Sequence, residues 1–155
     1  MEFALLSVPL ALLLLGAIQF GLLFGYKIHL AGAAAAGARW ASLNPSGWSA
    51  AAAPPSNTIE GQVLGAGGAA ATVLNDDSHV AIQYYAVSGS TVTYCGRYQA
   101  GAFAAQAGYT QVTCVVDGNL VKVTVTNSYP VLFRLFSNFG ANITLNGQAA
   151  MVLTG

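Results

Sequence analysis

The sequence predicts an α+β protein with a long N-terminal hydrophobic helix, residues 1–43, a linker, residues 44–57, and a small antiparallel β-rich head, residues 58–155. Three observations support this prediction. No charge occurs between Glu2 and Lys27, hydrophobic residues alternate with period two after His79, and only 6% of residues are charged whereas 55% are hydrophobic. Ordinary soluble domains are about 25% charged. The composition therefore favours either a membrane-associated chain or a subunit whose apolar surface is covered by other copies of the same chain.

The apolar run of residues 3–26 is long enough to cross a hydrocarbon core about 30 Å thick. A cleaved signal peptide is the competing interpretation, but signal peptides begin with basic residues and have a shorter apolar core. Strong helix formers follow, with no proline between Pro9 and Pro45, so we expect the helix to continue to residue 43. Such a rod would be about 60 Å long, and Pro9 is expected to kink it locally.

Small residues recur at spacing four along this rod. Ala17, Gly21 and Gly25 form one stripe, and Ala33 with Gly37 repeats the spacing. Such stripes allow helix backbones to approach closely within a membrane. Chance is the alternative, because alanine and glycine are abundant in this chain. The low charge of the second half of the rod favours packing against protein.

A single short helix is expected after the linker. Asn57 and Glu60 have the spacing of a capping box, which predicts a helix over residues 58–74 that ends at the acidic turn, residues 75–77. Four glycines within this range make the helix intrinsically weak. It is expected to pack on the sheet through an apolar face.

Four or five strands are expected in the remainder of the head. Alternating residues predict strands at 79–87 and 90–95 around a Ser88-Gly89 turn, and a last strand within 142–154. The segment 109–127 is expected to form a hairpin around Asp117-Gly118, a strong turn signal. Val121, Val123 and Val125 alternate with polar residues, which predicts that one face of this strand is buried and that the other faces solvent.

The two cysteines, Cys95 and Cys114, are expected on neighbouring strands, where they can form a disulfide. A pair of buried thiols is the alternative. A disulfide would place the head outside the cytoplasm, because the cytoplasm keeps thiols reduced. The positive-inside rule favours the opposite orientation, since Lys27 and Arg39 follow the span, but we give the cysteines more weight than two cations.

The sequence predicts no catalytic residue, no cofactor site, no metal site and no nucleic-acid partner. His29 and His79 lack a second histidine at ligand spacing, and the adjacent Asp76 and Asp77 are typical of a solvated turn, with weak calcium binding as the alternative. Net charge is zero, so the chain has no excess of basic residues of the kind that binds nucleic acid. Asn142 begins an Asn-Ile-Thr glycosylation sequon. Trp40 and Trp48 are equally consistent with a membrane interface and with packing.

Five short motifs resemble the TadE/TadG-like proteins of tight-adherence pilus systems, a branch of the type IV pilin superfamily. They touch both ends of the chain and leave residues 45–110 uncovered: "EFAL" at 2–5, "QFG" at 19–21, "GAR" at 37–39, "VTVTNSYP" at 123–130 and "ITLNGQAAMV" at 143–152. The resemblance implies a type IV pilin-like protein without catalysis. Members carry a basic leader before the Glu-Phe pair, whereas this sequence starts at Met1, and many have an acidic residue where Gln19 stands.

The function that this resemblance implies is a structural pilin subunit that polymerises through its N-terminal helix into an extracellular pilus. A minor pseudopilin or a membrane-anchored accessory protein of the assembly machine is the alternative. The implied partners are copies of the chain, a prepilin peptidase, the assembly machinery and, before assembly, the inner membrane. The resemblance also implies that Glu2 meets the N-terminal amine of a neighbouring subunit. Pairing a charge at one axial offset would set the register of assembly.

Overall fold

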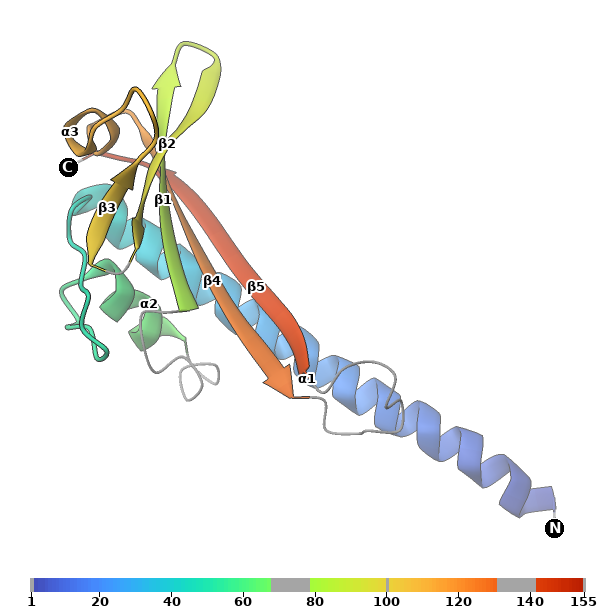
Figure 1. The fold of residues 1–155 in the computed structure, drawn as a ribbon. Helices are drawn as coiled ribbons and strands as arrows, with labels where there is room; N and C mark the ends of the chain where they lie inside the picture. The colour runs from blue at the N-terminus through green and yellow to red at the C-terminus, as the bar shows by residue number, and fades with distance from the viewer. Residues whose placement is uncertain (1, 68–78, 100, 131–141, 155) are drawn as a thin grey trace.

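The computed structural model of the chain describes residues 2–67, 79–99, 101–130 and 142–154. Its longest element is helix α1, Glu2–Leu43, which includes Pro9 and continues well beyond Tyr26 as predicted. The head contains five strands and two further short helices, so the predicted α+β class is confirmed (Figure 1). The single short helix that was predicted is accompanied by a second one.

The sheet is entirely antiparallel, with the strand order β3-β2-β1-β4-β5. Its strands are β1 (Val80–Ser88), β2 (Thr91–Gln99), β3 (Ala102–Ala105), β4 (Leu120–Pro130) and β5 (Asn142–Val152). The central strand β1 therefore lies between β2, its hairpin partner, and β4, which begins more than thirty residues after β1 ends.

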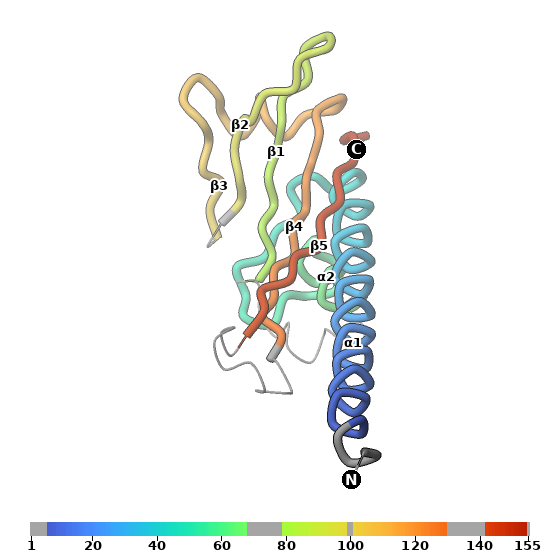
Figure 2. The backbone as a smooth tube through the Cα atoms, turned by 90° about the vertical axis from the view of Figure 1, so that its right-hand side faces the viewer, coloured from blue at the N-terminus to red at the C-terminus, as the bar shows by residue number. Residues whose placement is uncertain are grey.

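One face of the sheet packs on the second half of α1 (Figure 2). Val121, Val123 and Val125 are fully buried, whereas the alternate residues Lys122 and Thr124 are only partly buried. The predicted alternation of β4 is therefore confirmed. Leu30, Ala33, Ala34, Ala38 and Ala41 line the helix side of this core. Alanines at these positions permit close contact between helix and sheet, because they project little beyond the backbone.

The predicted hairpin over residues 109–127 is wrong in its first half. Residues Gln111–Cys114 form the short helix α3, and the sheet partner missing from the prediction is β3. Thr110 and Thr113 close a reciprocal capping box, in which Thr110 N donates to Thr113 Oγ1 at 2.9 Å. This local hydrogen bonding competes with strand pairing. The Asp117-Gly118 turn is present and leads into β4, with Gly118 at φ 86°.

The predicted capping box of Asn57 and Glu60 is also wrong. Helix α2 spans Ile59–Ala66, and its N-cap is Thr58, whose hydroxyl accepts a hydrogen bond from Gly61 N at 3.1 Å. Glu60 instead turns to the preceding loop and accepts a bond from Ser49 N at 3.1 Å. Gly67 caps the C-terminal end, so the helix is shorter than predicted, and the acidic turn at 75–77 lies outside the described residues.

Candidate functional site: the projecting half of the long helix

Helix α1 consists of two halves with different surroundings. From Leu30 onward one face of the helix is fully buried against the head. Before Tyr26 the large side chains of the described residues are mostly exposed, with Leu13 at 73% and Phe20 at 71% of their accessible surface. This half projects beyond the strands of the head (Figures 1 and 2). An apolar surface of this extent requires lipid or protein to cover it.

The segment Leu6–Leu43 is long and apolar enough to cross a membrane. The sequence has no charged residue between Glu2 and Lys27, and the helix satisfies its own backbone hydrogen bonds, as a bilayer requires. The apolar helix therefore suggests membrane anchoring.

The small residues of α1 divide between its two halves. Ala17 and Gly21 are exposed, Gly25 is partly exposed, and open space surrounds the position that a Cβ atom would take at Gly21 or Gly25. Gly37, by contrast, packs against Val63 of α2, and its neighbour Ala33 is fully buried. The second small-residue pair is thus used within the chain, whereas the first leaves room for another helix.

The projecting half lies within a recognisable sequence segment. Residues 1–39 match the family model of the TadE-like proteins. The resemblance seen in the sequence is therefore confirmed for this segment. The TadE-like family suggests a role in tight-adherence pilus assembly and implies association with the pilus machinery. TadE-like pilus proteins are structural or assembly components, and the family suggests a location at the cell surface. No match was found among curated proteins or solved structures.

Two residues proposed for assembly lie at the start of the TadE-like segment. Glu2 is the first residue of α1, and its side chain lies outside the described part of the structure, as does all of Met1. Their pairing in an assembly remains a prediction. The stripe of Ala17, Gly21 and Gly25 begins about four turns further along the same projecting half.

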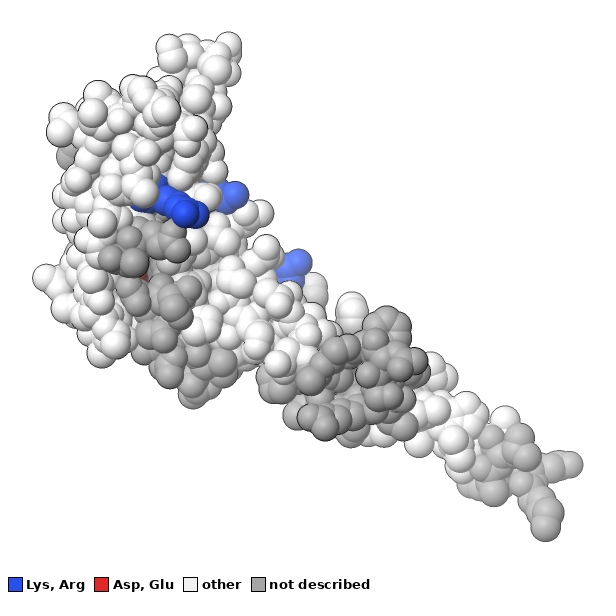
Figure 3. All heavy atoms as spheres, in the orientation of Figure 1, with Lys and Arg blue, Asp and Glu red and all other residues white. Residues whose placement is uncertain are grey.

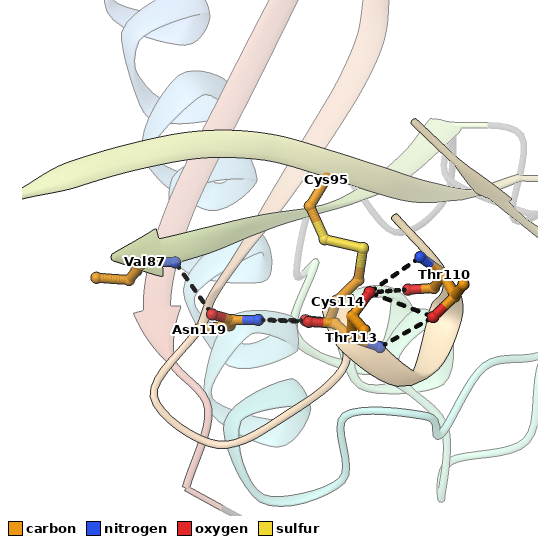
Figure 4. The surroundings of a disulfide bond; sticks show 6 residues. All are labelled: Val87, Cys95, Thr110, Thr113, Cys114 and Asn119. Carbon is orange, nitrogen blue, oxygen red and sulfur yellow. Dashed lines mark hydrogen bonds between the residues drawn. A yellow bond between two sulfur atoms is a disulfide. The ribbon is translucent and has the colours of Figure 1, made fainter. Parts of the chain in front are cut away.

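The end of the head far from Glu2 is held together by a disulfide and an asparagine (Figure 4). Cys95 of β2 and Cys114 of α3 are joined, with their Cα atoms 5.7 Å apart. Buried Asn119 accepts a hydrogen bond from Val87 N at 3.0 Å and donates to Cys114 O at 3.0 Å. The β1–β2 hairpin and α3 are therefore fixed to one another both covalently and by hydrogen bonds. Sequence reasoning singled out the cysteines but missed Asn119, because its role depends on three separate elements.

An aromatic cluster holds the loop after α1 against the sheet. Trp48 stacks on Tyr98, with ring centroids 4.7 Å apart, and its Nε1 donates to the Tyr84 hydroxyl at 2.8 Å. That hydroxyl in turn donates to Pro45 O at 2.6 Å. Burial raises the pKa of Tyr84, the Trp48 hydrogen bond lowers it, and nearby Glu60 raises it. Trp48 thus packs against the core of the head and is partly buried.

The remaining residues singled out by sequence are dispersed. His29 is exposed on α1, and His79 directly precedes β1. Among the described residues, no group of three or more His, Cys, Asp or Glu side chains could hold a metal. Asn142 is exposed as the first residue of β5, and Asp76 and Asp77 lie outside the described residues.

Proposed function

We propose that this protein is a structural subunit of a tight-adherence pilus and polymerises through the projecting half of α1. The observation that supports the proposal is the exposed apolar face of this half, which belongs to a TadE-like segment and includes an open stripe of small residues. The link to the wider type IV pilin superfamily is part of the proposal. No enzymatic activity is proposed, and no cofactor is required for this function.

The proposed helix has two successive environments. In the cytoplasmic membrane, lipid covers Leu13, Phe20 and their neighbours; in the filament, helices of adjacent copies cover them. Since lipid tails are as apolar as leucine, helices associate in a membrane by close packing and by polar contacts. The stripe at Ala17, Gly21 and Gly25 provides the close packing. The pair of Glu2 with a neighbouring Met1 amine provides the polar contact.

The proposed topology places the head, residues 58–155, on the outer side of the membrane and then on the pilus surface. The Cys95–Cys114 bond supports this orientation, because disulfides persist in oxidising compartments. A prepilin peptidase and the assembly machinery are the proposed partners before polymerisation. Trp48 and Ser49 contact the head, so the first part of the linker, residues 44–57, is attached to the head.

The test is the composition of sheared surface filaments. Cells that express the tagged chain are sheared, the filaments are examined by negative-stain microscopy, and mass spectrometry measures the stoichiometry of this chain. A structural subunit should be a main species of the filament and should label along its length. Labelling only at a filament end would identify a minor pseudopilin. If the chain is confined to the membrane fraction, it is an accessory protein. The long apolar span alone is sufficient to anchor such a protein in the membrane.

A further inference from the structure

The face of the sheet opposite α1 presents a row of polar residues across three neighbouring strands. Lys122 of β4 is directly paired with Gln83 of β1, which is directly paired with Arg97 of β2. Directly paired residues point to the same face of an antiparallel sheet. Val121 and Val123, on either side of Lys122, are buried on the α1 face. The two cations therefore lie on the face opposite α1, on either side of one amide and with backbones about 10 Å apart.

Neither cation of this row is paired with another side chain that the structure describes. Arg97 is exposed and Lys122 is partly exposed, and neither makes an ion pair or side-chain hydrogen bond with another described residue. Figure 3 shows basic side chains along this side of the molecule. Of the acidic side chains that the structure describes, Glu60 is buried and Asp117 lies in the turn before β4. The described part of the face is consequently positive.

Two tyrosines adjoin the row. Tyr85 of β1 is directly paired with Tyr94 of β2, and their rings meet edge to face with centroids 5.6 Å apart. The Tyr85 hydroxyl donates to Gln83 Oε1 at 3.2 Å, which orients the amide between the two cations. Both tyrosines are partly exposed. The face thus combines an aromatic pair, an oriented amide and two cations.

We propose that this face binds an acidic polysaccharide, with Arg97 and Lys122 recognising carboxylate groups on successive parts of the polymer. A guanidinium forms two parallel hydrogen bonds with a carboxylate, and an ammonium acts as a compact charge. The rings of Tyr85 and Tyr94 supply an apolar surface for the C–H face of a sugar, and the Tyr85 hydroxyl, which donates to Gln83, can still accept a hydrogen bond. The Gln83 NH₂ group donates to sugar hydroxyls.

The charges disfavour two other occupants. A second copy of this chain offers few acidic side chains, because the sequence has only five and Glu60 is buried. Duplex DNA has one negative charge per about 1.7 Å of its axis, and proteins that bind it through phosphates typically make about 6–10 such contacts. Two cations on a flat strand surface are too few for that. A polymer with widely spaced carboxylates matches the separation of Lys122 and Arg97.

The test measures binding of the full-length chain, purified in non-ionic detergent, to fluorescent polygalacturonate. The double variant Arg97→Gln/Lys122→Gln removes the proposed site. Its matched control, Lys27→Gln/Arg39→Gln, makes the same changes at exposed positions on α1 and has the same net charge. We expect the first variant to bind about tenfold more weakly or worse, and the control to bind within about twofold of the wild type. Near-UV circular dichroism checks that both variants retain the fold.

Two further measurements separate the contribution of the aromatic rings from that of the two cations. Tyr94→Ala should weaken binding and leave its salt dependence unchanged, because it removes sugar contact without removing charge. Neutral dextran should bind much more weakly than polygalacturonate. Absence of polygalacturonate binding near physiological salt, or an equal loss in both double variants, would overturn the proposal. Tighter binding to duplex DNA, lost in the Arg97/Lys122 variant, would overturn it in favour of nucleic acid. None of these measurements requires filaments, so their outcome is independent of the proposed pilus function.

Discussion

Gly147 of β5 lies directly against the backbone carbonyl group of Leu30 in α1, so that a Cβ atom at residue 147 would overlap the helix. The contact joins the edge strand to the point at which α1 becomes buried. Gly147 is directly paired with Val125, which is fully buried on the same face. This glycine therefore determines how closely the helix approaches the sheet.

The first prediction is that Gly147→Ala destabilises the head by about 3 kcal/mol, at the upper end of the range for overpacked cores, because helix backbone cannot move aside as a side chain can. Thermal or denaturant unfolding of the detergent-solubilised chain measures the effect. Gly65→Ala is the matched control, since its Cβ would meet nothing within 4 Å and it lies inside α2. That control should be neutral or stabilising by up to about 1 kcal/mol. Equal stability of both variants would show that α1 and β5 are not in this close contact.

Local periodicity predicted most of the fold, and its errors have identifiable physical causes. The strands β1, β2 and β4 contain β-branched or aromatic residues with period two, β5 has the apolar residues Ile143 and Leu145 near its start at the same spacing, and each strand was expected near its observed position. Residues 109–116 have the same β-rich composition, yet the Thr110 capping box and the bond from Cys114 to β2 favour a helical turn. Strand β3 consists of three alanines and one phenylalanine, which gives no alternation to detect.

The candidate sites differ in how far the sequence could predict them. The projecting half of α1 is a continuous segment, so its apolar run and stripe are visible without a structure. The row of Lys122, Gln83 and Arg97 depends on the register of three strands, including a shift between Tyr84 and Tyr85 in the β1–β2 pairing. Register is determined by packing of the buried face and by turns, so local sequence did not bring these residues together.

The second prediction concerns the disulfide. Cys95 and Cys114 are separated by 19 residues, and in the chain-entropy model a bridge closing such a loop stabilises the fold by about 3 kcal/mol. Reduction with a phosphine, or the variant Cys95→Ser, should therefore lower the melting temperature of the head. Alkylation of the unreduced protein followed by mass spectrometry measures the thiols directly. Two alkylated cysteines in native material would contradict the prediction and support the alternative of buried thiols.

The third prediction concerns alkaline pH. Burial raises the pKa of Tyr84 above the ordinary tyrosine value of about 10, so the folded chain retains this proton at a pH at which the unfolded chain releases it. The stabilisation is therefore complete below pH 10 and is lost as the pH rises from there towards the folded pKa. We expect the wild-type melting temperature to fall above pH 10, and Tyr84→Phe to show a shallower decline.

At neutral pH, Tyr84→Phe should itself cost about 1–2 kcal/mol, because Pro45 O and Trp48 Nε1 both lose their partner. Tyr94→Phe, at a partly exposed position on the opposite face, serves as the control for loss of a hydroxyl. An unchanged pH slope in Tyr84→Phe would show that other groups dominate the alkaline transition.

The fourth prediction tests the small-residue stripe. Gly25→Leu places a large side chain where a second helix is proposed to approach, and should abolish filaments while leaving the chain in the membrane. Open space around this position within the chain means that the head should retain its melting temperature. Filament yield after shearing and immunoblots of the membrane fraction measure the two effects. Gly16→Leu is the control, because Gly16 has equally open space but lies on a different face of α1. Normal filament yield in Gly25→Leu would show that the stripe does not face a neighbouring helix.

The last prediction concerns Glu2, the acidic residue before an apolar span. If its carboxylate pairs with the amine of a neighbouring subunit, Glu2→Ala and Glu2→Gln should both reduce assembly sharply, since either change leaves the amine without its partner. An unpaired charge near the centre of a membrane helix costs about 2.5–3.5 kcal/mol, which is enough to disfavour the wrong axial offset between copies. Expression, membrane insertion and processing should be unaffected, as measured by immunoblot and by the mass of the mature chain. Asp117→Asn is the matched control, because it removes one carboxylate from an exposed turn of the head. If Glu2 only faces lipid headgroups, Glu2→Gln should assemble like the wild type, because a neutral amide is at least as well tolerated there, and that outcome would exclude the pairing mechanism.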